Sequence, residues 1–312
     1  MREIKIRAFR IENPDIAQTH SDLCAKLKEI LKKSSSAETR RMQLNADDVQ
    51  KEEDLLSYFA DTAANAEYQF CTMLRIAPGN EIQHISNGLF NKEKFTLSDL
   101  NASLVDAEAI YKDHYYFAVS NNFAVTDLPG NTTIRRLQTY LNWLLSGLYE
   151  LTPLVEITAM PNLSNVRNIT IQDPISQQTI EESEKREKSV FDLKAMAVDY
   201  LKSLINDATS LKDEDLAQIV SAKLVVEFSR PKKSTSEELQ KIYGALLKPV
   251  ADTDHVLIKT RDNKTIAKGK DILRIRRVKI DETDSGKVNE NTVNQEMQKF
   301  LRDLENEKKN SG

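Results

Sequence analysis

Apolar and polar residues alternate in short segments of this chain, and other segments carry apolar residues at every third or fourth position. Residues 4–11 alternate, with Ile4, Ile6 and Ala8 on one side, which predicts a half-buried strand. Residues 291–308 carry sparse apolar positions at helical spacing, which predicts a charged helix packed through one narrow stripe. By the same criteria, strands are expected at residues 4–11, 68–77, 115–119, 122–126, 151–158, 166–172, 222–228, 256–260, near Thr265 and at 272–280, and helices at 16–33, 46–60, 132–148, 190–206, 234–247 and 291–308.

The C-terminal part has a regular order of strand, helix, strand and strand. This order predicts a β-α-β-β unit, in which a small mixed sheet has one helix on its back. Ser234 or Thr235 begins the helix, with Glu238 in reach of a capping box. The unit comprises residues 222–228, 234–247, 256–260 and the strand near Thr265, followed by a further strand at 272–280.

A polar and charged segment at residues 173–188 separates this unit from the elements before it and is a candidate domain boundary. We therefore expect an α+β protein of two parts, each with small mixed or antiparallel sheets backed by helices. The N-terminal domain would comprise residues 1–175. The C-terminal domain, with a basic hairpin and the terminal helix, would comprise residues 176–312.

The composition narrows the class of protein. The chain has 312 residues, 40% apolar and 29% charged, which is enough for one large domain or two medium ones. No apolar run approaches the ~18 to 20 residues that a membrane helix needs, and the first residues lack the apolar stretch of a secretory signal. Cys24 and Cys71 have neither metal-site nor redox-pair spacing. We expect a cytoplasmic protein without membrane insertion.

The sequence contains no motif that we assign to catalysis. The histidines are scattered, with no H-x-x-x-H pair for zinc, and there is no G-x-S-x-G, Walker A or dinucleotide-type glycine pattern. We therefore expect no metal and no cofactor. Because an active site can consist of residues scattered along a chain, the catalytic residues, if any, stay unknown at this point.

Positive charge is concentrated in residues 259–279, although the net charge of the whole chain is −4. This segment holds nine Lys and Arg residues against Asp262 and Asp271. Such a basic hairpin favours contact with a polyanion, and five or six phosphate contacts would make binding strongly salt dependent. The alternative is that these side chains are solvated charges that protect a sheet edge from aggregation. Together with a second cluster after the strand at 222–228, the expected nucleic-acid contacts are Arg230, Lys232, Lys233, Lys264, Lys268, Lys270, Arg274, Arg276, Arg277 and Lys279.

Two weaker basic groups lie earlier in the chain. Arg135 and Arg136 open the helix after Pro129-Gly130, where backbone N–H groups favour an anion, although an ordinary solvated first turn is the simpler explanation. The first strand carries a further set, which either contacts the polyanion or is a solvated edge. That set is Lys5, Arg7 and Arg10. Aromatic residues are not interleaved with these cations, so phosphate contact should dominate over base reading.

From residue 105 onward, the order of elements resembles that of the RexA/KwaB-like phage exclusion and antiphage defence proteins. The segments that carry the resemblance are YYFAVSNNFAVTD, TTIRRLQTYLNWLL, AKLVVEFSRPKK and HVLIKTRDNKTIAKGKDILRIRRVK. The resemblance implies a dimeric, largely sequence-independent DNA-binding protein that responds to phage infection. It implies DNA contact at Arg230, Lys232, Lys233 and residues 264–279, and it supplies no catalytic residue.

Three readings of the function follow. The first is an abortive-infection type of antiphage protein that binds nucleic acid, DNA rather than RNA, through its basic C-terminal sheet. The second is a toxin enzyme acting on RNA, either a nuclease or a nucleotidyl or ADP-ribosyl transferase. The third is a structural protein whose basic hairpin meets an acidic partner protein, encoded nearby. The terminal helix and the helix that carries Trp143 are candidates for a homodimer interface.

Overall fold

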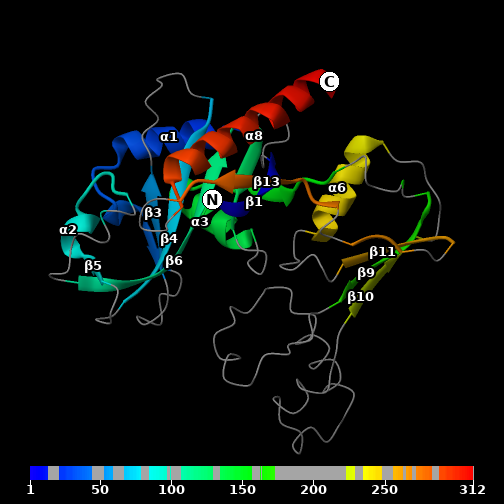
Figure 1. The fold of residues 1–312 in the computed structure, drawn as a ribbon, viewed down its shortest axis with the longest axis horizontal. Coiled ribbons are helices and arrows are strands. Elements are labelled where there is room, and N and C mark those ends of the chain that lie inside the picture. Colours follow the sequence, from blue (N-terminus) through cyan, green and yellow to red (C-terminus); the bar gives the residue numbers. More distant parts are fainter. Residues whose placement is uncertain are drawn as a thin grey trace, which may run out of the picture. The chain divides into compact units, whose positions relative to one another are not determined.

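The chain forms two compact units, which we call unit 1 and unit 2 (Figure 1). Unit 1 comprises Met1–Leu154 and Arg274–Gly312, and unit 2 comprises Val155–Leu273. Unit 2 is therefore an insertion in the sequence of unit 1. The computed structural model describes residues 1–12, 21–43, 53–58, 67–78, 84–96, 99, 107–128, 134–156, 162, 164–172, 223–228, 235–247, 256–262, 265–268, 272–282 and 288–311.

Unit 1 is built on a nine-stranded sheet in which every described pair of strands is antiparallel. The strand order is β13-β1-β7-β6-β4-β3-β2, and β5 pairs with β6 while β8 pairs with β1. The strands are β1 (Arg2–Glu12), β2 (Arg41–Gln43), β3 (Glu53–Tyr58), β4 (Gln69–Pro78), β5 (His84–Ser86), β6 (Ala107–Val119), β7 (Phe123–Thr126), β8 (Glu150–Pro153) and β13 (Ile275–Ile280).

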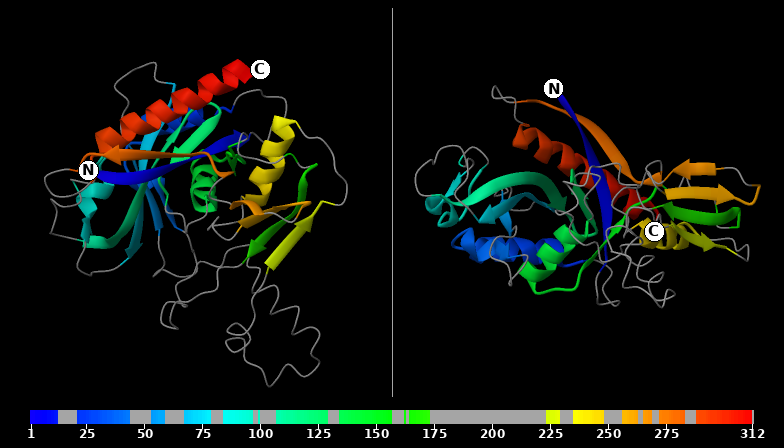
Figure 2. Two further views of the ribbon diagram at one scale, coloured as in Figure 1. Left: turned by 45° about the vertical axis from the view of Figure 1, so that its right-hand side comes forward. Right: turned by 90° about the horizontal axis from the view of Figure 1, so that it is seen from below.

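Helices cover both faces of this sheet. Successive residues of a strand point to opposite faces, so Tyr115 and Phe117 of β6 pack with α1 and α3, whereas Tyr116 and Ala118 pack with α8. Figure 2 shows β1 and β13 running side by side next to α8. The helical elements are α1 (Leu23–Lys33), η1 (Glu38–Arg40), α2 (Asn87–Phe90), α3 (Arg135–Leu145) and α8 (Glu290–Ser311).

Unit 2 is a smaller antiparallel sheet with one helix packed on it. The strand order is β10-β9-β11-β12, and apolar residues of β9, β11 and α6 form its core. The expected capping box begins α6: the Thr235 N–H donates to Glu238 Oε2 (2.9 Å) and the Glu238 N–H donates to Thr235 Oγ1 (3.2 Å). The elements are β9 (Val166–Gln172), β10 (Lys223–Glu227), α6 (Ser236–Leu247), β11 (Val256–Thr260) and β12 (Thr265–Lys268).

The structure confirms the α+β class. The elements of the expected β-α-β-β unit are present as β10-α6-β11-β12, but β9 lies between β10 and β11 and every described pair is antiparallel, so the sheet is not the mixed one expected. The helix expected at residues 46–60 is wrong, because Glu53–Tyr58 forms the strand β3. All six residues of β3 are buried, with Leu55 and Leu56 on opposite faces of the sheet. A strand buried on both faces shows no clean alternation, so its periodicity does not distinguish it from a helix.

Two other expectations fall on residues that the structure does not describe. The helix at residues 190–206 and the domain boundary between residues 175 and 176 both lie outside the described residues. By its contacts the chain divides after Leu154 and again before Arg274, so β13 and α8 belong with the N-terminal elements in unit 1.

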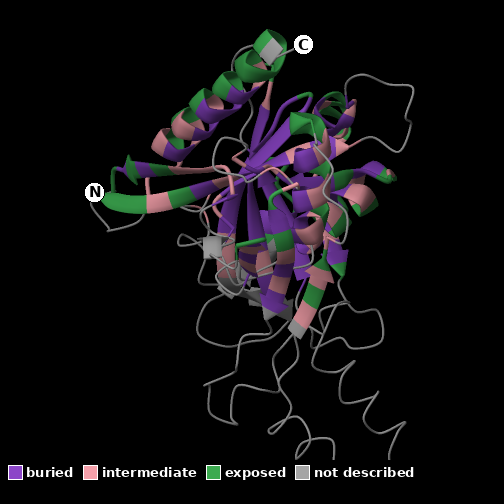
Figure 3. Cartoon of the chain, turned by 90° about the vertical axis from the view of Figure 1, so that its right-hand side faces the viewer, coloured by how far each residue is buried: buried purple, intermediate pink, exposed green. Residues whose placement is uncertain are grey.

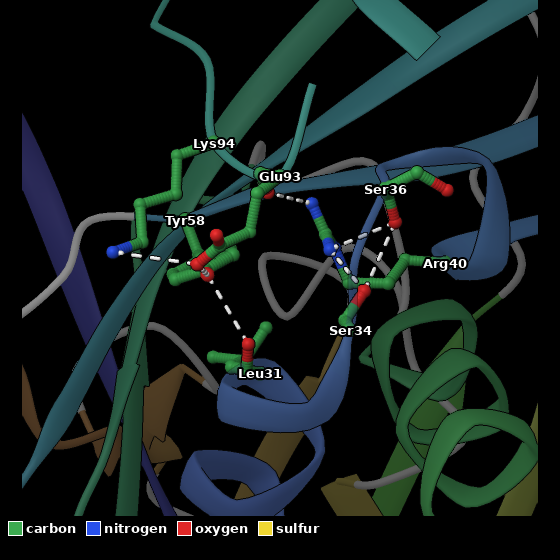
Figure 4. A network of polar contacts seen from close by, with 7 residues as sticks. All are labelled: Leu31, Ser34, Ser36, Arg40, Tyr58, Glu93 and Lys94. Atoms are coloured by element: carbon green, nitrogen blue, oxygen red, sulfur yellow. Dashed lines mark hydrogen bonds and ion pairs between the residues drawn. The ribbon is translucent and has the colours of Figure 1, made fainter. Parts of the chain in front are cut away.

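A buried arginine fixes the segment between α1 and β2 (Figure 4). The Arg40 guanidinium is fully buried and donates to the carbonyl oxygens of Ser36 (3.1 Å), Leu56 (3.3 Å) and Glu93 (2.7 Å). It also lies over the Tyr58 ring, 4.9 Å from the centroid. The guanidinium therefore holds three separate segments of unit 1 together through carbonyl oxygens that are shielded from water.

We predict that Arg40→Met destabilises the protein by about 3 kcal/mol, because each buried carbonyl that loses its donor keeps its desolvation cost. Urea unfolding followed by circular dichroism measures the change. Lys33→Met is the control, since Lys33 is exposed and its ion pair with Glu29 (2.5 Å) lies on the helix surface. A cost for Arg40→Met no larger than that of the control would contradict the prediction.

Candidate nucleic-acid interface

The basic segment that the sequence presented as one hairpin is divided between the two units. The strand at 272–280 exists as β13, but it pairs with β1 in unit 1, whereas β12 pairs with β11 in unit 2. The expected continuous hairpin is therefore not formed. Val278 and Ile280 of β13 are buried against the apolar side of α8, and this burial favours the pairing of β13 with the larger sheet. Of the expected contacts, Lys268 belongs to β12, and Arg230, Lys232, Lys233, Lys264 and Lys270 lie outside the described residues.

Two of the expected contacts, Arg276 of β13 and Arg274 directly before it, are engaged inside unit 1. Arg274 forms an ion pair with Glu307 of α8 (2.5 Å), and Arg276 forms one with Asp303 (2.5 Å). The Arg276 guanidinium also lies 4.4 Å from the centroid of the Phe300 ring. Both arginines share a side of β13 with Val278, so they border the apolar contact between β13 and α8.

The remaining cations of β13 lie on its other side and meet those of β1. Lys5 is directly opposite Arg277 in the β1–β13 register, and Glu3 is opposite Lys279. All four residues are exposed, and the Arg277 side chain retains 63% of its accessible surface. We call the exposed set Lys5, Arg277 and Lys279 the cationic face. One cation of the first strand and two of the C-terminal strand therefore belong to one surface.

The cationic face belongs to a two-stranded ribbon. The described partner of Arg2–Ile6 is β13, and β7 joins β1 from Arg7 onward. On the opposite side of the ribbon, Ile6 and Ile280 are buried against α8. Figure 3 shows that the start of β1, next to the N-terminus, is exposed and that its farther part is mostly buried. The ribbon is thus apolar and packed on one side and charged and solvated on the other.

Two positive charges on this ribbon lie directly opposite each other on the paired strands. Like charges directly opposite in an antiparallel pair are destabilising, and Lys5 and Arg277 form such a pair. One carboxylate of the face, on Glu3, lies 3.4 Å from Arg277. Alternate residues of a strand are about 6.6 Å apart, which is comparable with the separation of neighbouring phosphates on a nucleic-acid strand. A phosphate backbone along the ribbon would relieve the repulsion.

Arg7 lies at the inner end of the cationic face, where the ribbon joins the rest of the sheet. Its Nη2 donates to the Leu128 carbonyl oxygen (2.5 Å), and burial lowers the pKa of the guanidinium to about 10, so that it stays charged near neutral pH. Asp127 is close enough to Arg7 to attract it. Arg10, in contrast, lies on the α8 side of β1. Burial lowers the pKa of Lys308, and the positive charge of Arg10 lowers it further.

The two arginines at the start of α3 are not both exposed, as a free anion site would require. Arg136 is buried and forms an ion pair with Asp54: its Nε lies 3.0 and 3.1 Å from the two carboxylate oxygens and its Nη2 lies 2.9 Å from Oδ1. The Asp54 side chain is 0% exposed and that of Arg136 is 5% exposed. Arg136 therefore joins α3 to the sheet, while its neighbour Arg135 is half-buried.

Sequence reasoning missed Asp127, which lies at the end of β7 beside the inner end of the cationic face. Its carboxylate accepts the Tyr116 N–H (2.6 Å), and burial raises its pKa to about 7. An acid directly before Leu128-Pro129-Gly130 reads as an ordinary turn residue, so the sequence carried no signal of this contact with the β6 backbone.

In the described part of the chain, no group of three or more His, Cys, Asp or Glu side chains is arranged to hold a metal ion. Cys24 and Cys71 are buried free thiols, and burial raises the pKa of the Cys24 thiol to about 11. Among the described helices, none is both long and apolar enough to span a membrane.

Comparisons with known proteins leave the family of this chain open. No protein-family model matches the sequence, and no curated protein is significantly similar to it.

We predict that Arg136→Met destabilises the protein by about 3 to 5 kcal/mol, because it leaves the Asp54 carboxylate buried without its partner. Thermal and urea unfolding measure the loss. The double variant Asp54→Leu/Arg136→Met should recover part of it, since both charges are then removed. Arg135→Met serves as the matched control at the adjacent, half-buried position. Equal costs for the Arg136 and Arg135 variants would show that the ion pair contributes nothing specific.

Proposed function

We propose that this protein binds nucleic acid, DNA rather than RNA, without strong sequence specificity, through the cationic face of the β1–β13 ribbon. The observation that supports this proposal is the register that sets Lys5 opposite Arg277, with Lys279 two residues away. Three cations are thereby held on a rigid, α8-backed ribbon and are left exposed. A solvated edge needs only scattered charges, whereas a polyanion site needs like charges brought together.

The chemistry of the cationic face favours phosphate contact over base reading. Its cations can replace counterions along the phosphate backbone, which gives affinity without sequence information. The face carries no aromatic residue, since the outward positions of the two strands are Glu3, Lys5, Arg277 and Lys279. Base stacking, on which single-strand binders rely, therefore has no platform on this ribbon.

The biological role that we propose is antiphage defence of the abortive-infection type in the cytoplasm. The resemblance of element order to the RexA/KwaB-like proteins supports this role. In this antiphage role the protein would act as a homodimer, with or without a partner protein encoded nearby. The contacts expected outside unit 1 stay a separate prediction, and each phosphate contact among them would steepen the salt dependence.

Charge reversal on the ribbon tests this proposal. In a mobility-shift assay with a random-sequence duplex, Lys5→Glu/Arg277→Glu/Lys279→Glu should bind more weakly at every salt concentration. Removing three phosphate contacts should lower the slope of log affinity against log salt by about 2.7. Single-stranded DNA and duplex RNA of the same sequence are compared in parallel.

The control carries the same change of charge elsewhere. Lys299→Glu/Arg302→Glu/Lys309→Glu places three acids on the exposed side of α8. This variant should keep most of the wild-type affinity and slope. Unchanged binding by the ribbon variant, or equal losses in both variants, would contradict the assignment of the site. Circular dichroism confirms that both variants are folded.

A further inference from the structure

The strand β13 forms one edge of the larger sheet. It is the last strand in the described strand order, and β1 is its partner on the inner side. Among the described residues, no strand pairs with its outer side. A strand edge without a partner presents a row of N–H and C=O groups that another extended chain can bond.

The hydrogen bonds of β1 show which residues of β13 direct their backbone outward. The Ala8 N–H donates to the Arg274 carbonyl oxygen (3.1 Å), whereas the Ile11 N–H donates to the carbonyl oxygen of Asn122, directly before β7 (2.8 Å). Even-numbered residues of β1 therefore bond toward β13, because the direction alternates along an antiparallel strand. By the register, their even-numbered partners on β13 bond back to β1. The residues of β13 that turn their N–H and C=O groups outward are consequently Ile275, Arg277 and Lys279.

The side chains of these outward residues lie on one side of β13. Arg277 and Lys279 are exposed members of the cationic face, and Ile275 on the same side is half-buried. A strand added at this edge would set the side chains of its bonded residues directly opposite these three. Opposite charges in such cross-strand positions stabilise a pair and like charges destabilise it. The edge therefore favours a strand that carries acids at alternate positions.

Charge also protects this edge against other strands. Native sheet edges are commonly protected by proline, by a bulge or by charged side chains. β13 contains no proline, and its pairing with β1 shows no register shift. A second copy of β13, paired antiparallel, would set cations against cations, because Arg277 and Lys279 point to the same face. The edge therefore disfavours a second copy of itself and admits an acidic strand.

We propose that the outer edge of β13 binds an acidic segment of a partner protein as an added antiparallel strand. The outward backbone groups would supply the hydrogen bonds, and Arg277 and Lys279 would select carboxylates at alternate positions. β13 has six residues, so an extended segment of similar length fits the edge. This inference goes beyond the proposed function. Because the acids of the segment would neutralise Arg277 and Lys279, the partner and a nucleic acid would exclude each other on the cationic face.

Peptide binding to the full-length protein, without nucleic acid, tests this proposal. The probe is a fluorescent peptide in which glutamate and valine alternate, and fluorescence anisotropy measures its binding. In an added strand, the glutamates opposite Arg277 and Lys279 are also the residues whose N–H groups face β13. N-methylation of the glutamates should therefore abolish binding, whereas N-methylation of the valines should retain it. Equal binding of the two methylated peptides would overturn the proposal, because charge alone would then hold the peptide.

Two substitutions at one position separate the backbone from the charge. Arg277→Gln removes the positive charge and keeps the outward N–H, whereas Arg277→Pro removes both. Proline is tolerated on an edge strand where its nitrogen faces solvent, so the pairing with β1 should be retained. We expect Arg277→Gln to weaken binding of the peptide about threefold, as for the loss of one cross-strand charge pair. Arg277→Pro should abolish it, and equal losses in the two variants would contradict strand addition. If circular dichroism shows that Arg277→Pro does not fold, the methylated peptides still decide with the wild-type protein.

Amide hydrogen exchange read by NMR locates the bound peptide. In the free protein, the N–H groups of Ile275, Arg277 and Lys279 should exchange faster than those of Arg276 and Val278, which bond to β1. A saturating concentration of the alternating peptide should slow exchange at the three outward positions. Bound peptide that leaves these three amides unprotected would place the contact elsewhere and rule out the added strand.

Discussion

The structure of unit 1 depends on one strand, β1, which is paired on both edges and is covered on both faces along its second half. It pairs with β7 on one edge and with β13 and β8 on the other. Its residues Ile6 and Ala8 are buried with α8, while Phe9 and Ile11 belong to the core beneath α1 and α3. Since β13 follows the inserted unit 2 in the sequence, the larger sheet is completed only when the chain returns to β1.

This arrangement decides which basic residues are available to a ligand. On β13, neighbouring residues point to opposite sides, so Arg276 meets Asp303 of α8 while Arg277 points to solvent. The same alternation on β1 separates Arg10 from Lys5. A charge count cannot distinguish these cases, because it treats ion-paired and exposed cations alike. Because side chains alternate between the two sides of each paired strand, only some cations of the basic segment share a surface, and on that surface like charges lie opposite each other.

Unit 1 also shows two ways of satisfying a buried arginine. The guanidinium of Arg40 donates to carbonyl oxygens of three segments, and that of Arg136 forms an ion pair with the carboxylate of Asp54. Both arrangements fix the positions of structural elements, since a buried charge without partners is costly.

The sequence by itself determined the features that depend on neighbours a few residues apart. The hairpin of β6 and β7, the capping box of α6 and the apolar stripe of α8 all follow from local periodicity and side-chain chemistry. The tertiary structure alone decided the strand nature of β3, the partner of β13 and the engagement of Arg136 with Asp54. These depend on which distant surfaces bury one another, and burial on both faces erases the period that reveals a strand. The basic segment was visible as charge, but only its pairing with β1 determined which cations face solvent.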